Sequence, residues 1–564
     1  MKRFEDMKYG VFIHCVAGLT PRADGTVPQL PDEFADGFDV PAFAESVAAT
    51  GAEYVVLTAW HCRMRPLYPS LVTESIRPGN SCWRDLLGEI IDALAARDIA
   101  VVLYTHPRDG HDLQGEERTA TGWGEGCAPG REDTPSPDTF DYEAWNGYVL
   151  ALYRELAERY AGRIVGFYTD GVGPTHGKSP VMGRNFQVVD YTAIRDIMKS
   201  ANEKLVMIQN YFGYLFSDDI GMPEGFFGYE NKVGFAFDRL PAPADCIALC
   251  PFGGWMPPVA PRAAAPLKMT AREMAIYTLF AGSAAAAGGV CWACAPYAEG
   301  GVWQPRVIET LSETAKLLAP YAPYFAASRP SAAYPTLPGD TLKAKGGYFF
   351  AESADGATEY LFVAAGAGEQ ITLPAPENGA ELSAPEVALG DLHIEGFDKT
   401  EGGFELRLSG EHGEMPAVIA FRVNAPGPRC RRVNDTDRHI RYEGEWKYRF
   451  LKGDDAVPLG CYESDYHVAE QAGASAFLAF EGDRAAVFAN LRPENGSARV
   501  FIDGVYAGLA AANGEDSARR CVFESRALHG GTHTLYLELC GDGPFELDMI
   551  RIDASGAGSQ STVR

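Results

Sequence analysis

Eight short apolar runs recur between amphipathic segments over roughly the first 325 residues, and this alternation limits the fold more than any other feature of the sequence. The runs lie at 9–14, 53–58, 100–105, 164–169, 205–210, 225–230, 245–250 and 289–294. Their apolar residues are mostly continuous, which is typical of parallel strands covered on both faces. Segments 83–97, 142–160, 190–201 and 271–281 carry apolar residues at helical spacing. The pattern predicts an α/β fold, an irregular (β/α)8 TIM-like barrel over residues 1–327.

The character of the sequence changes at about residue 328. Helical stripes stop, and short alternating runs separated by Gly, Pro, Asn and Asp follow. These runs predict a β-sandwich over 328–427 and, beyond a Pro/Arg/Cys-rich linker, a second β module over 428–564. Strands of the second module are expected near 475–481, 484–491, 498–502 and 532–539, with an Asp-Gly turn at 503–504.

Composition narrows the class of protein. Hydrophobic residues make up 46% and charged residues 22%, as in ordinary globular chains, and the net charge is −27. Such an acidic chain disfavours binding to nucleic acid or to an anionic membrane surface. No apolar stretch is long enough to span a membrane, and no apolar run follows the N-terminus. We therefore expect a cytoplasmic protein, or a secreted one if a leader has been removed, and the sequence is compatible with a homo-oligomer.

Cysteine usage points to no disulfide framework. The 12 cysteines are scattered, and Cys291-x-x-Cys294 is one isolated pair inside an apolar run. We interpret this pair as buried thiols in a strand rather than as a metal or redox site.

Polar and aromatic residues gather where the predicted strands end, which is where barrel enzymes hold their active sites. In chain order these residues are His14, Trp60, His61, His106, Asp170, Asn210, Glu230, Trp255 and Trp292. Carboxylates, histidines and tryptophans suit a sugar, because aromatic faces stack on the ring while polar groups bind hydroxyls. Two carboxylates also serve the hydrolysis of a glycosidic bond.

Each of these residues has a structural alternative. His14 could be a core histidine, Asp170-Gly171 a simple turn, and Glu230 a helix cap or a partner of Arg239. Zinc ligation by the three histidines and Asp170 is a further alternative, but neither His-x-His on the first strand nor a helical His pair supports it. We therefore expect no metal. Glycine-rich phosphate loops and dinucleotide fingerprints are absent after every predicted strand, so no cofactor is expected either.

At these strands the sequence resembles the α-L-fucosidases of glycoside hydrolase family 29. The segments that carry the resemblance are 9–16 (YGVFIHCV), 51–65 (GAEYVVLTAWHCRMR), 68–70 (YPS), 84–89 (RDLLGE), 103–104 (LY), 168–171 (YTDG) and, loosely, 288–300. The family's first two strands read Phe-Gly-x-Phe-Ile-His-Trp-Gly and Gly-Ala-Lys-Tyr-Val-Val-Leu-Thr-Ala-Lys-His-His-Asp-Gly-Phe. The resemblance covers about residues 4–325, and the second-strand segment is the most specific.

The resemblance implies a retaining, exo-acting glycosidase that removes a terminal sugar. Asp170 would be the nucleophile, and His14 and His61 would bind sugar hydroxyls. Glu230, in an aromatic setting that would raise its pKa, is the expected acid/base, with Glu224 in reserve. The substrate-binding set predicted in full is His14, His61, Trp60, Tyr104, His106, Arg63, Asn210, Trp255 and Trp292.

Departures from the family pattern leave two alternatives open. The family's second histidine is Cys62 here, and its following Asp is Arg63. Arg63 and Arg65 could read an acidic or modified sugar, or the barrel could be a degenerate one that binds carbohydrate without turnover. The last module, about 438–553, resembles a galactose-binding-like jelly roll, which either binds carbohydrate or packs on the barrel.

Overall fold

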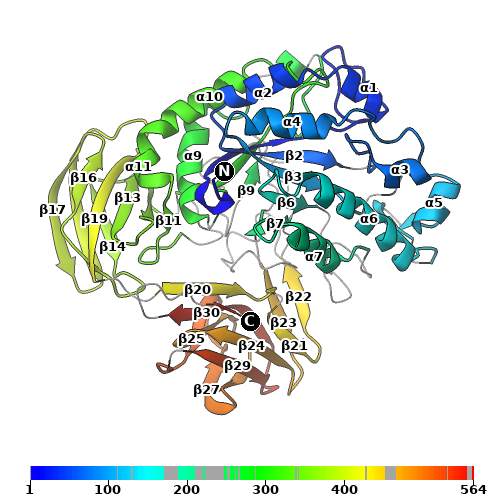
Figure 1. The fold of residues 1–564 in the computed structure, drawn as a ribbon. Coiled ribbons are helices and arrows are strands. Elements are labelled where there is room, and N and C mark those ends of the chain that lie inside the picture. The colour runs from blue at the N-terminus through cyan, green and yellow to red at the C-terminus, as the bar shows by residue number, and fades with distance from the viewer. Residues whose placement is uncertain are drawn as a thin grey trace.

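The computed structural model describes residues 2–554 and 562–563, apart from a set of internal gaps. The gaps are 62, 109, 111, 129–130, 137, 171–187, 210–219, 223–246, 250–253, 261, 265–266, 286, 337–339, 341, 344, 426–428, 438, 451–464 and 530. The chain forms three parts, a curved parallel sheet wrapped by helices and two antiparallel sandwiches (Figure 1).

The first part is an eight-stranded sheet whose neighbouring strands are all parallel. Its order is β8-β7-β6-β3-β2-β1-β10-β9. Apart from β8 and β9, strands that follow one another in this sheet along the chain are neighbours, and the first strand, β1, also pairs with the last, β10, as in a barrel. The strands are β1 (Tyr9–Ile13), β2 (Tyr54–Trp60), β3 (Ala100–Thr105), β6 (Gly166–Thr169), β7 (Val206–Gln209), β8 (Ile220–Gly221), β9 (Ile247–Leu249) and β10 (Val290–Ala293). Among the described residues no pairing joins β8 to β9, so the described sheet is an open, curled barrel.

Helices cover the convex face of this sheet (Figure 1). The helices of this part are α1 (Pro31–Asp36), α2 (Val40–Ala49), α3 (Leu71–Ile76), α4 (Leu86–Ala95), α5 (Glu116–Thr121), α6 (Tyr142–Tyr160), α7 (Tyr191–Ala201), α9 (Ala271–Ala284), α10 (Val307–Leu318), η4 (Ala319–Tyr321) and α11 (Ala322–Phe325), whereas η1 (Phe4–Asp6) packs Phe4 into the inner core of the barrel and η3 (Arg262–Ala264) buries no side chain. Four of them begin at an aspartate whose carboxylate accepts a hydrogen bond from an amide of the first turn: Asp39, Asp85, Asp141 and Asp190. Such caps satisfy amides that have no partner within the helix.

The barrel prediction is confirmed, and the sixth strand differs in place from the predicted run. The strand that pairs with β7 is β8 at Ile220–Gly221, where no strand was predicted. A two-residue strand is too short to leave a pattern in the sequence. The predicted run 225–230 lies outside the described residues. A small hairpin of β4 (Cys127–Ala128) and β5 (Arg131–Pro135) lies between α5 and α6.

The first sandwich follows directly on the barrel. One sheet contains β11 (Arg329–Pro330), β12 (Tyr348–Glu352), β13 (Thr358–Val363), β15 (Glu381–Leu382), β16 (Glu386–Leu389) and β19 (Ala417–Ala425), and the other contains β14 (Gln370–Pro374), β17 (Leu392–Thr400) and β18 (Gly403–Gly410). Phe349 and Phe362, on paired strands, lie in one core with Phe280 of α9. The barrel and this sandwich therefore share apolar packing.

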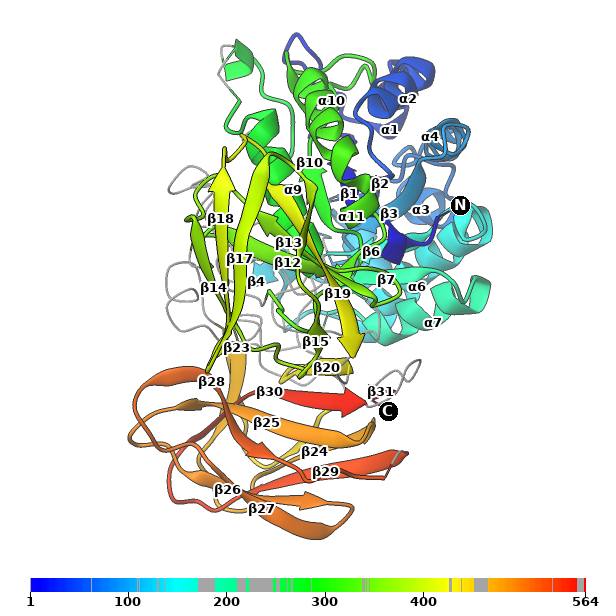
Figure 2. The same ribbon diagram turned by 90° about the vertical axis from the view of Figure 1, so that its left-hand side faces the viewer.

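The second sandwich also has two sheets. One contains β20 (Arg429–Asn434), β22 (Lys447–Phe450), β23 (Asp465–Ala469), β25 (Arg484–Leu491), β28 (Ser517–Glu524) and β30 (Phe545–Ala554), and the other β21 (Arg441–Glu443), β24 (Ser475–Glu481), β26 (Ser497–Ile502), β27 (Val505–Ala511), β29 (Thr532–Leu539) and β31 (Thr562–Val563). We call the second of these the distal sheet, because β26, β27 and β29 lie at the end of the molecule farthest from the barrel (Figures 1 and 2). Asp503 and Gly504, both at positive φ, form the predicted turn between β26 and β27.

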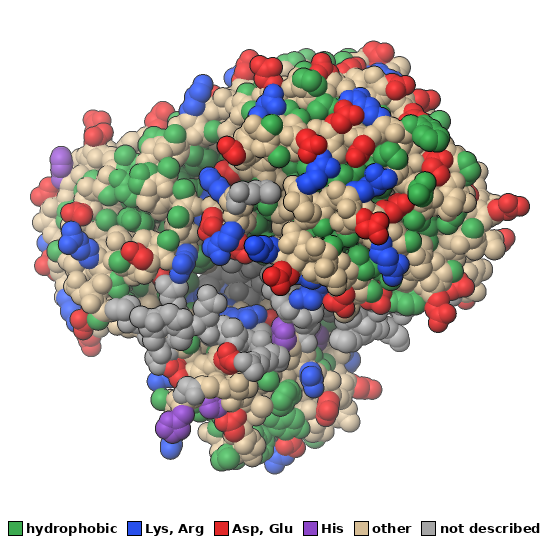
Figure 3. Space-filling model, in the orientation of Figure 1, with side chains coloured by type: hydrophobic (Ala, Val, Ile, Leu, Met, Phe, Trp, Pro, Cys, Tyr) green, Lys and Arg blue, Asp and Glu red, His purple; other side chains and the backbone are tan. Residues whose placement is uncertain are grey.

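Acidic side chains are spread over the face of the molecule drawn in Figure 3, in keeping with the net charge of −27. Across the helices that the structure describes, none combines the length and the apolar character needed to cross a membrane.

Candidate functional site

Successive side chains of a strand point to opposite faces of the sheet, so every second residue of a barrel strand points into the barrel. Phe12, Tyr104 and Tyr168 belong to the apolar core inside the curved sheet, whereas Val11, Leu103 and Phe167 face the helices. His14, His106 and Asp170 each stand two residues after one of the inner aromatic residues. The same alternation that builds the inner core therefore brings polar side chains together above it.

Three predicted histidines and a tyrosine form one cluster at this end of the barrel. The His14 ring centroid lies 5.3 Å from that of His61 and 5.2 Å from that of Tyr104. His61 in turn stacks on Tyr104 at 5.4 Å and 13°, and lies 5.4 Å from His106. His14 also lies 5.0 Å from half-buried Trp255. The structure thus brings together five of the predicted substrate-binding residues.

Asp170 sits at the rim of the same cluster, directly after β6. Its amide donates to the carbonyl of Thr105 at 2.9 Å, which continues the ladder between β3 and β6 by one residue. The hydroxyl of Tyr104 donates a hydrogen bond to Asp170 Oδ2. Asp170 is only 9% exposed, so the hydrogen bond from Tyr104 is largely shielded from water and holds the carboxylate in one orientation.

Burial determines the charge of His14. Desolvation, reinforced by neighbouring His61, lowers the pKa of His14 well below its ordinary value, and the Asp170 carboxylate only partly opposes this. A neutral imidazole is thereby favoured at neutral pH, and it can both donate and accept hydrogen bonds, as recognition of sugar hydroxyls requires.

Two predicted tryptophans lie away from the cluster. Trp60 packs edge-on against Tyr153 of α6 at 5.5 Å, and Trp292 donates from Nε1 to Thr278 of α9 at 3.1 Å. Both side chains are buried in the core between sheet and helices. For Trp60 the reason is a bulge between Thr58 and Trp60, which reverses the alternation along β2. Direct stacking on a sugar is therefore proposed for Trp255 alone of the three.

Arg63 belongs to the rim just beyond His61. It has φ 75°, and its carbonyl accepts a hydrogen bond from Arg77 Nη1 at 2.7 Å. Arg77 is buried and also pairs with Asp112, which Arg65 contacts as well. A Cβ on Gly18 would approach Arg63 Nη1 to 2.4 Å, so the guanidinium rests on the backbone of the loop after β1. The half-buried Arg63 thus ties two rim loops together.

The remaining predicted residues lie outside the described part of the chain. These are Asn210, Glu230 and the reserve acid/base Glu224. In chain order, Glu224 follows the end of β8 more closely than Glu230 does.

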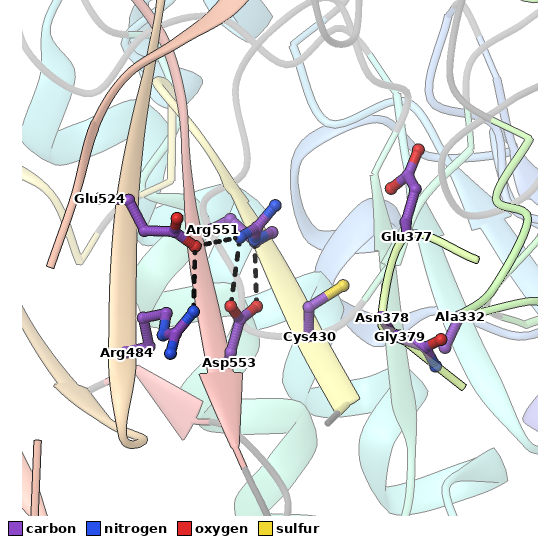
Figure 4. A pocket seen from close by; sticks show the side chains of 9 residues that line it. All are labelled: Ala332, Glu377, Asn378, Gly379, Cys430, Arg484, Glu524, Arg551 and Asp553. Atoms are coloured by element: carbon purple, nitrogen blue, oxygen red, sulfur yellow. Dashed lines mark hydrogen bonds and ion pairs between the residues drawn. The ribbon is translucent and has the colours of Figure 1, made fainter. Parts of the chain in front are cut away.

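A hollow of about 260 Å³ lies between the two sandwiches (Figure 4). Its lining residues are Ala332, Glu377, Asn378, Gly379, Cys430, Arg484, Glu524, Arg551 and Asp553. Arg551 pairs with Asp553 and with Glu524, which Arg484 also contacts. These charges largely compensate one another, so we do not regard this hollow as the catalytic site.

The zinc alternative, with three histidines and Asp170 as ligands, can be compared with the geometry. Across the described ranges, no group of three His, Cys, Asp or Glu side chains is arranged to hold a metal ion. Cys291 and Cys294 are both buried, as expected for thiols in and beside a strand.

Sequence reasoning missed the contacts that organise the cluster. Tyr104 was predicted to bind substrate, but its bond to Asp170 was not foreseen, and neither was the ring of Phe12 beneath His14 at 4.9 Å. Arg77, which fixes the rim, was missed as well. The period of two from His14 back to Phe12 and from His106 back to Tyr104 is the signal that could have placed both aromatic residues beneath the cluster.

Comparison with known proteins bears on the same region. Residues 28–218 match the model of a family described as Alpha-L-fucosidase, which confirms the resemblance over a range that includes His61, Tyr104, His106 and Asp170. A comparison with curated proteins gives no significant match.

Solved structures extend the likeness in fold. An alpha-L-fucosidase from Vibrio sp. strain EJY3 covers 98% of this chain and 97% of its own at 14% identity and TM-score 0.51. An alpha-L-fucosidase GH29 from Bacteroides thetaiotaomicron covers 75% of this chain and 94% of its own at 15% identity and TM-score 0.50. A second structure of a Bacteroides thetaiotaomicron enzyme, described as a trapped covalent intermediate with 2-fluoro-fucosyl fluoride, has 17% identity, TM-score 0.51 and coverages of 75% and 95%. The barrel and the β-rich part that follows thus have the fold of family 29 fucosidases.

Proposed function

We propose that this chain is a retaining, exo-acting glycosidase that removes a terminal α-L-fucose or a closely related sugar from a glycan. The observation that carries the proposal is the buried Asp170 carboxylate, fixed by Tyr104 beside three histidines at the carboxyl end of the barrel strands. The match of residues 28–218 to the fucosidase family model supports the sugar class.

In the proposed reaction, an oxygen of Asp170 attacks the anomeric carbon and the bond to the leaving oxygen breaks. A glutamic acid, Glu230 or Glu224, gives its proton to that leaving oxygen. Water then attacks the glycosyl ester with the same glutamate as base, which releases the sugar with retained configuration. The trapped covalent intermediate with 2-fluoro-fucosyl fluoride described for the Bacteroides thetaiotaomicron enzyme supports this double displacement.

The other members of the cluster are proposed to bind and orient the sugar. Neutral His14 and its neighbours His61 and His106 would hydrogen-bond hydroxyl groups, while Trp255 would cover an apolar face of the ring. Tyr104 would hold Asp170 in its attacking orientation, because its hydroxyl donates to one carboxylate oxygen.

The test is release of the aryl group from a panel of aryl glycosides centred on the α-L-fucoside. Asp170→Asn should lower kcat by orders of magnitude, while Trp83→Ala, at an exposed position outside the cluster, should leave it unchanged. Asp170→Gly with added azide should yield a glycosyl azide of inverted configuration. Equal turnover by wild type and Asp170→Asn would refute the assignment of the nucleophile.

The acid/base is assigned by leaving-group dependence. Glu224→Gln and Glu230→Gln are compared on an aryl fucoside with a highly acidic phenol and on one with a poorly acidic phenol. The true acid/base variant should keep its glycosylation rate only with the acidic phenol, which needs no proton. A variant that treats both substrates like wild type is not the acid/base.

Arg63 favours one alternative sugar class. An arginine at the rim, where the family pattern has aspartate, suits a carboxylated or sulfated sugar. If the wild type hydrolyses an acidic aryl glycoside in preference to the fucoside, and Arg63→Ala loses this preference, the substrate is an acidic sugar and the proposed mechanism stands. Binding of free sugar without any turnover would instead favour a carbohydrate-binding protein.

A further inference from the structure

Four aromatic side chains line up across the outer face of the distal sheet. In register order they are Phe477 on β24, Tyr536 on β29, Phe501 on β26 and Tyr506 on β27. The Phe501 ring centroid lies 6.0 Å from that of Tyr536 and 5.7 Å from that of Tyr506. We call these four residues the aromatic row.

The alternation of the strands places the aromatic row on the outside. The residues on either side of Phe477, Tyr536 and Phe501 along their strands are buried in the core of the second sandwich. Successive side chains point to opposite faces of a sheet, so these three face away from that core. The outer face of the distal sheet also faces away from the barrel and the first sandwich (Figure 2).

The row opens to solvent at one end. Tyr506 is 57% exposed, and Leu509 on the same strand is 49% exposed. They are two of the eight large hydrophobic side chains that are exposed in the described part of the chain. Such a concentration on one strand is unusual for a surface that only meets water.

Charged residues of both signs lie next to the row: on β21, exposed Arg441 is directly opposite Phe477, and exposed Glu443 lies two residues further along the strand. Arg499 and Glu538, a directly opposed pair on β26 and β29, form an ion pair at 2.7 Å. A neutral surface on a chain of net charge −27 suits a neutral occupant. A second copy of the chain would bring the same large negative charge and be repelled at long range.

The spacing of the row also matches an extended glycan. The ring of Phe501 lies 5.7 Å from that of Tyr506 and 6.0 Å from that of Tyr536, a spacing on the scale of one sugar unit, and it is turned by 69° and 55° from them, so the row presents both faces and edges of its rings. Aromatic rings offer apolar faces to the C–H groups of sugars, while the tyrosine hydroxyls offer polar edges. We propose that the aromatic row binds a neutral, extended polysaccharide chain that crosses the strands of the distal sheet.

This site is separate from the barrel cluster, and the proposal does not depend on the barrel being catalytically active. Only its consequence for activity rests on the proposed function: the row would hold the chain on a polymer while the barrel removes terminal sugars from side chains of the same polymer. The effective concentration of polymer side chains near the barrel would then rise without any change in the barrel itself.

Native affinity electrophoresis of the full chain tests the proposal, with galactomannan, mixed-linkage β-glucan or anionic polygalacturonate in the gel. At least one neutral polymer should retard the wild type. Tyr506→Ala should weaken this retardation about two- to tenfold, and Tyr506→Ala/Tyr536→Ala should remove most of it. Trp83→Ala, which removes a ring that is 81% exposed on the barrel, is the matched control and should behave as wild type.

Three results would overturn the proposal. They are no retardation by either neutral polymer, equal retardation of wild type and Tyr506→Ala, and stronger retardation by polygalacturonate than by the neutral polymers. A Tyr506-dependent dimer in size-exclusion chromatography, without polymer binding, would assign the row to a second copy instead. Because neither neutral polymer contains fucose and no turnover is measured, failure here and failure of the glycosidase proposal are distinguishable.

Discussion

Removal of a single hydroxyl from Tyr104 is the sharpest test of how the cluster works. The Tyr104 hydroxyl donates to Asp170 Oδ2, and both side chains are buried, with exposed fractions of 0% and 9%. A hydrogen bond to a charged group contributes about 1.5–3 kcal/mol. If the bond orients Asp170 for attack, Tyr104→Phe should lower kcat/KM about 10- to 150-fold, since about 1.4 kcal/mol corresponds to tenfold in rate.

The assay is initial-rate hydrolysis of whichever aryl glycoside the wild type turns over best. Tyr153→Phe is the matched control, because Tyr153 hydrogen-bonds to Thr105, the next residue of β3, from the helix side. This control also loses one buried hydroxyl, but none that contacts Asp170. The two variants should have similar stability and differ in kcat/KM.

A folded Tyr104→Phe protein with kcat/KM within about threefold of wild type would refute the reasoning. Either the bond would then not orient Asp170, or Asp170 would not be the nucleophile. The Asp170→Asn result separates these two explanations, since only the second allows that variant to retain activity.

Three further predictions concern stability and protonation. Burial raises the pKa of Glu359 from 4.5 to about 8, and cross-strand Glu352 is a smaller cause of the same shift. The free energy of unfolding should therefore fall as pH rises from about 4.5 to about 8. At 1.36 kcal/mol per pH unit the loss is up to about 5 kcal/mol. In urea unfolding, Glu359→Gln should therefore stabilise the chain more at pH 9 than at pH 5, and an equal effect at both values would contradict the burial argument. A Cβ on Gly10 would lie 2.3 to 2.6 Å from the ring of Tyr54, whose hydroxyl is held by the carbonyl of Gly288, so Gly10→Ala should lower the free energy of unfolding by about 1–3 kcal/mol. Tyr54→Ala in the same chain should make the two changes less than additive, and full additivity would show that the clash is not with this ring. The lowered pKa of His14 means that the unfolded chain binds its proton first, so stability from this group is lost as pH falls below about 6.5. NMR of 13C-labelled histidine should show His14, assigned by His14→Gln, still neutral at pH 6, and a midpoint near 6.5 would contradict its desolvation.

Local patterns in the sequence determined much of the architecture. Helix α6 and strands β24, β25 and β29 begin and end where the periodicity predicted them, because amphipathic spacing and turn residues act over a few neighbours. The positions of His14, His61, His106 and Asp170 at strand ends also followed from the sequence, since the carboxyl ends of parallel strands meet at one rim.

Only the tertiary structure decided which way particular side chains face and which ones meet. Trp60 was expected at the site, but the bulge in β2 turns it toward α6, and no local pattern marks that bulge. The bond from Tyr104 to Asp170 depends on the pairing of β3 with β6, and the aromatic row depends on the register of four strands drawn from residues 475 to 539. Register and strand order are set by how the whole core packs, so contacts between distant segments are fixed only when the chain folds.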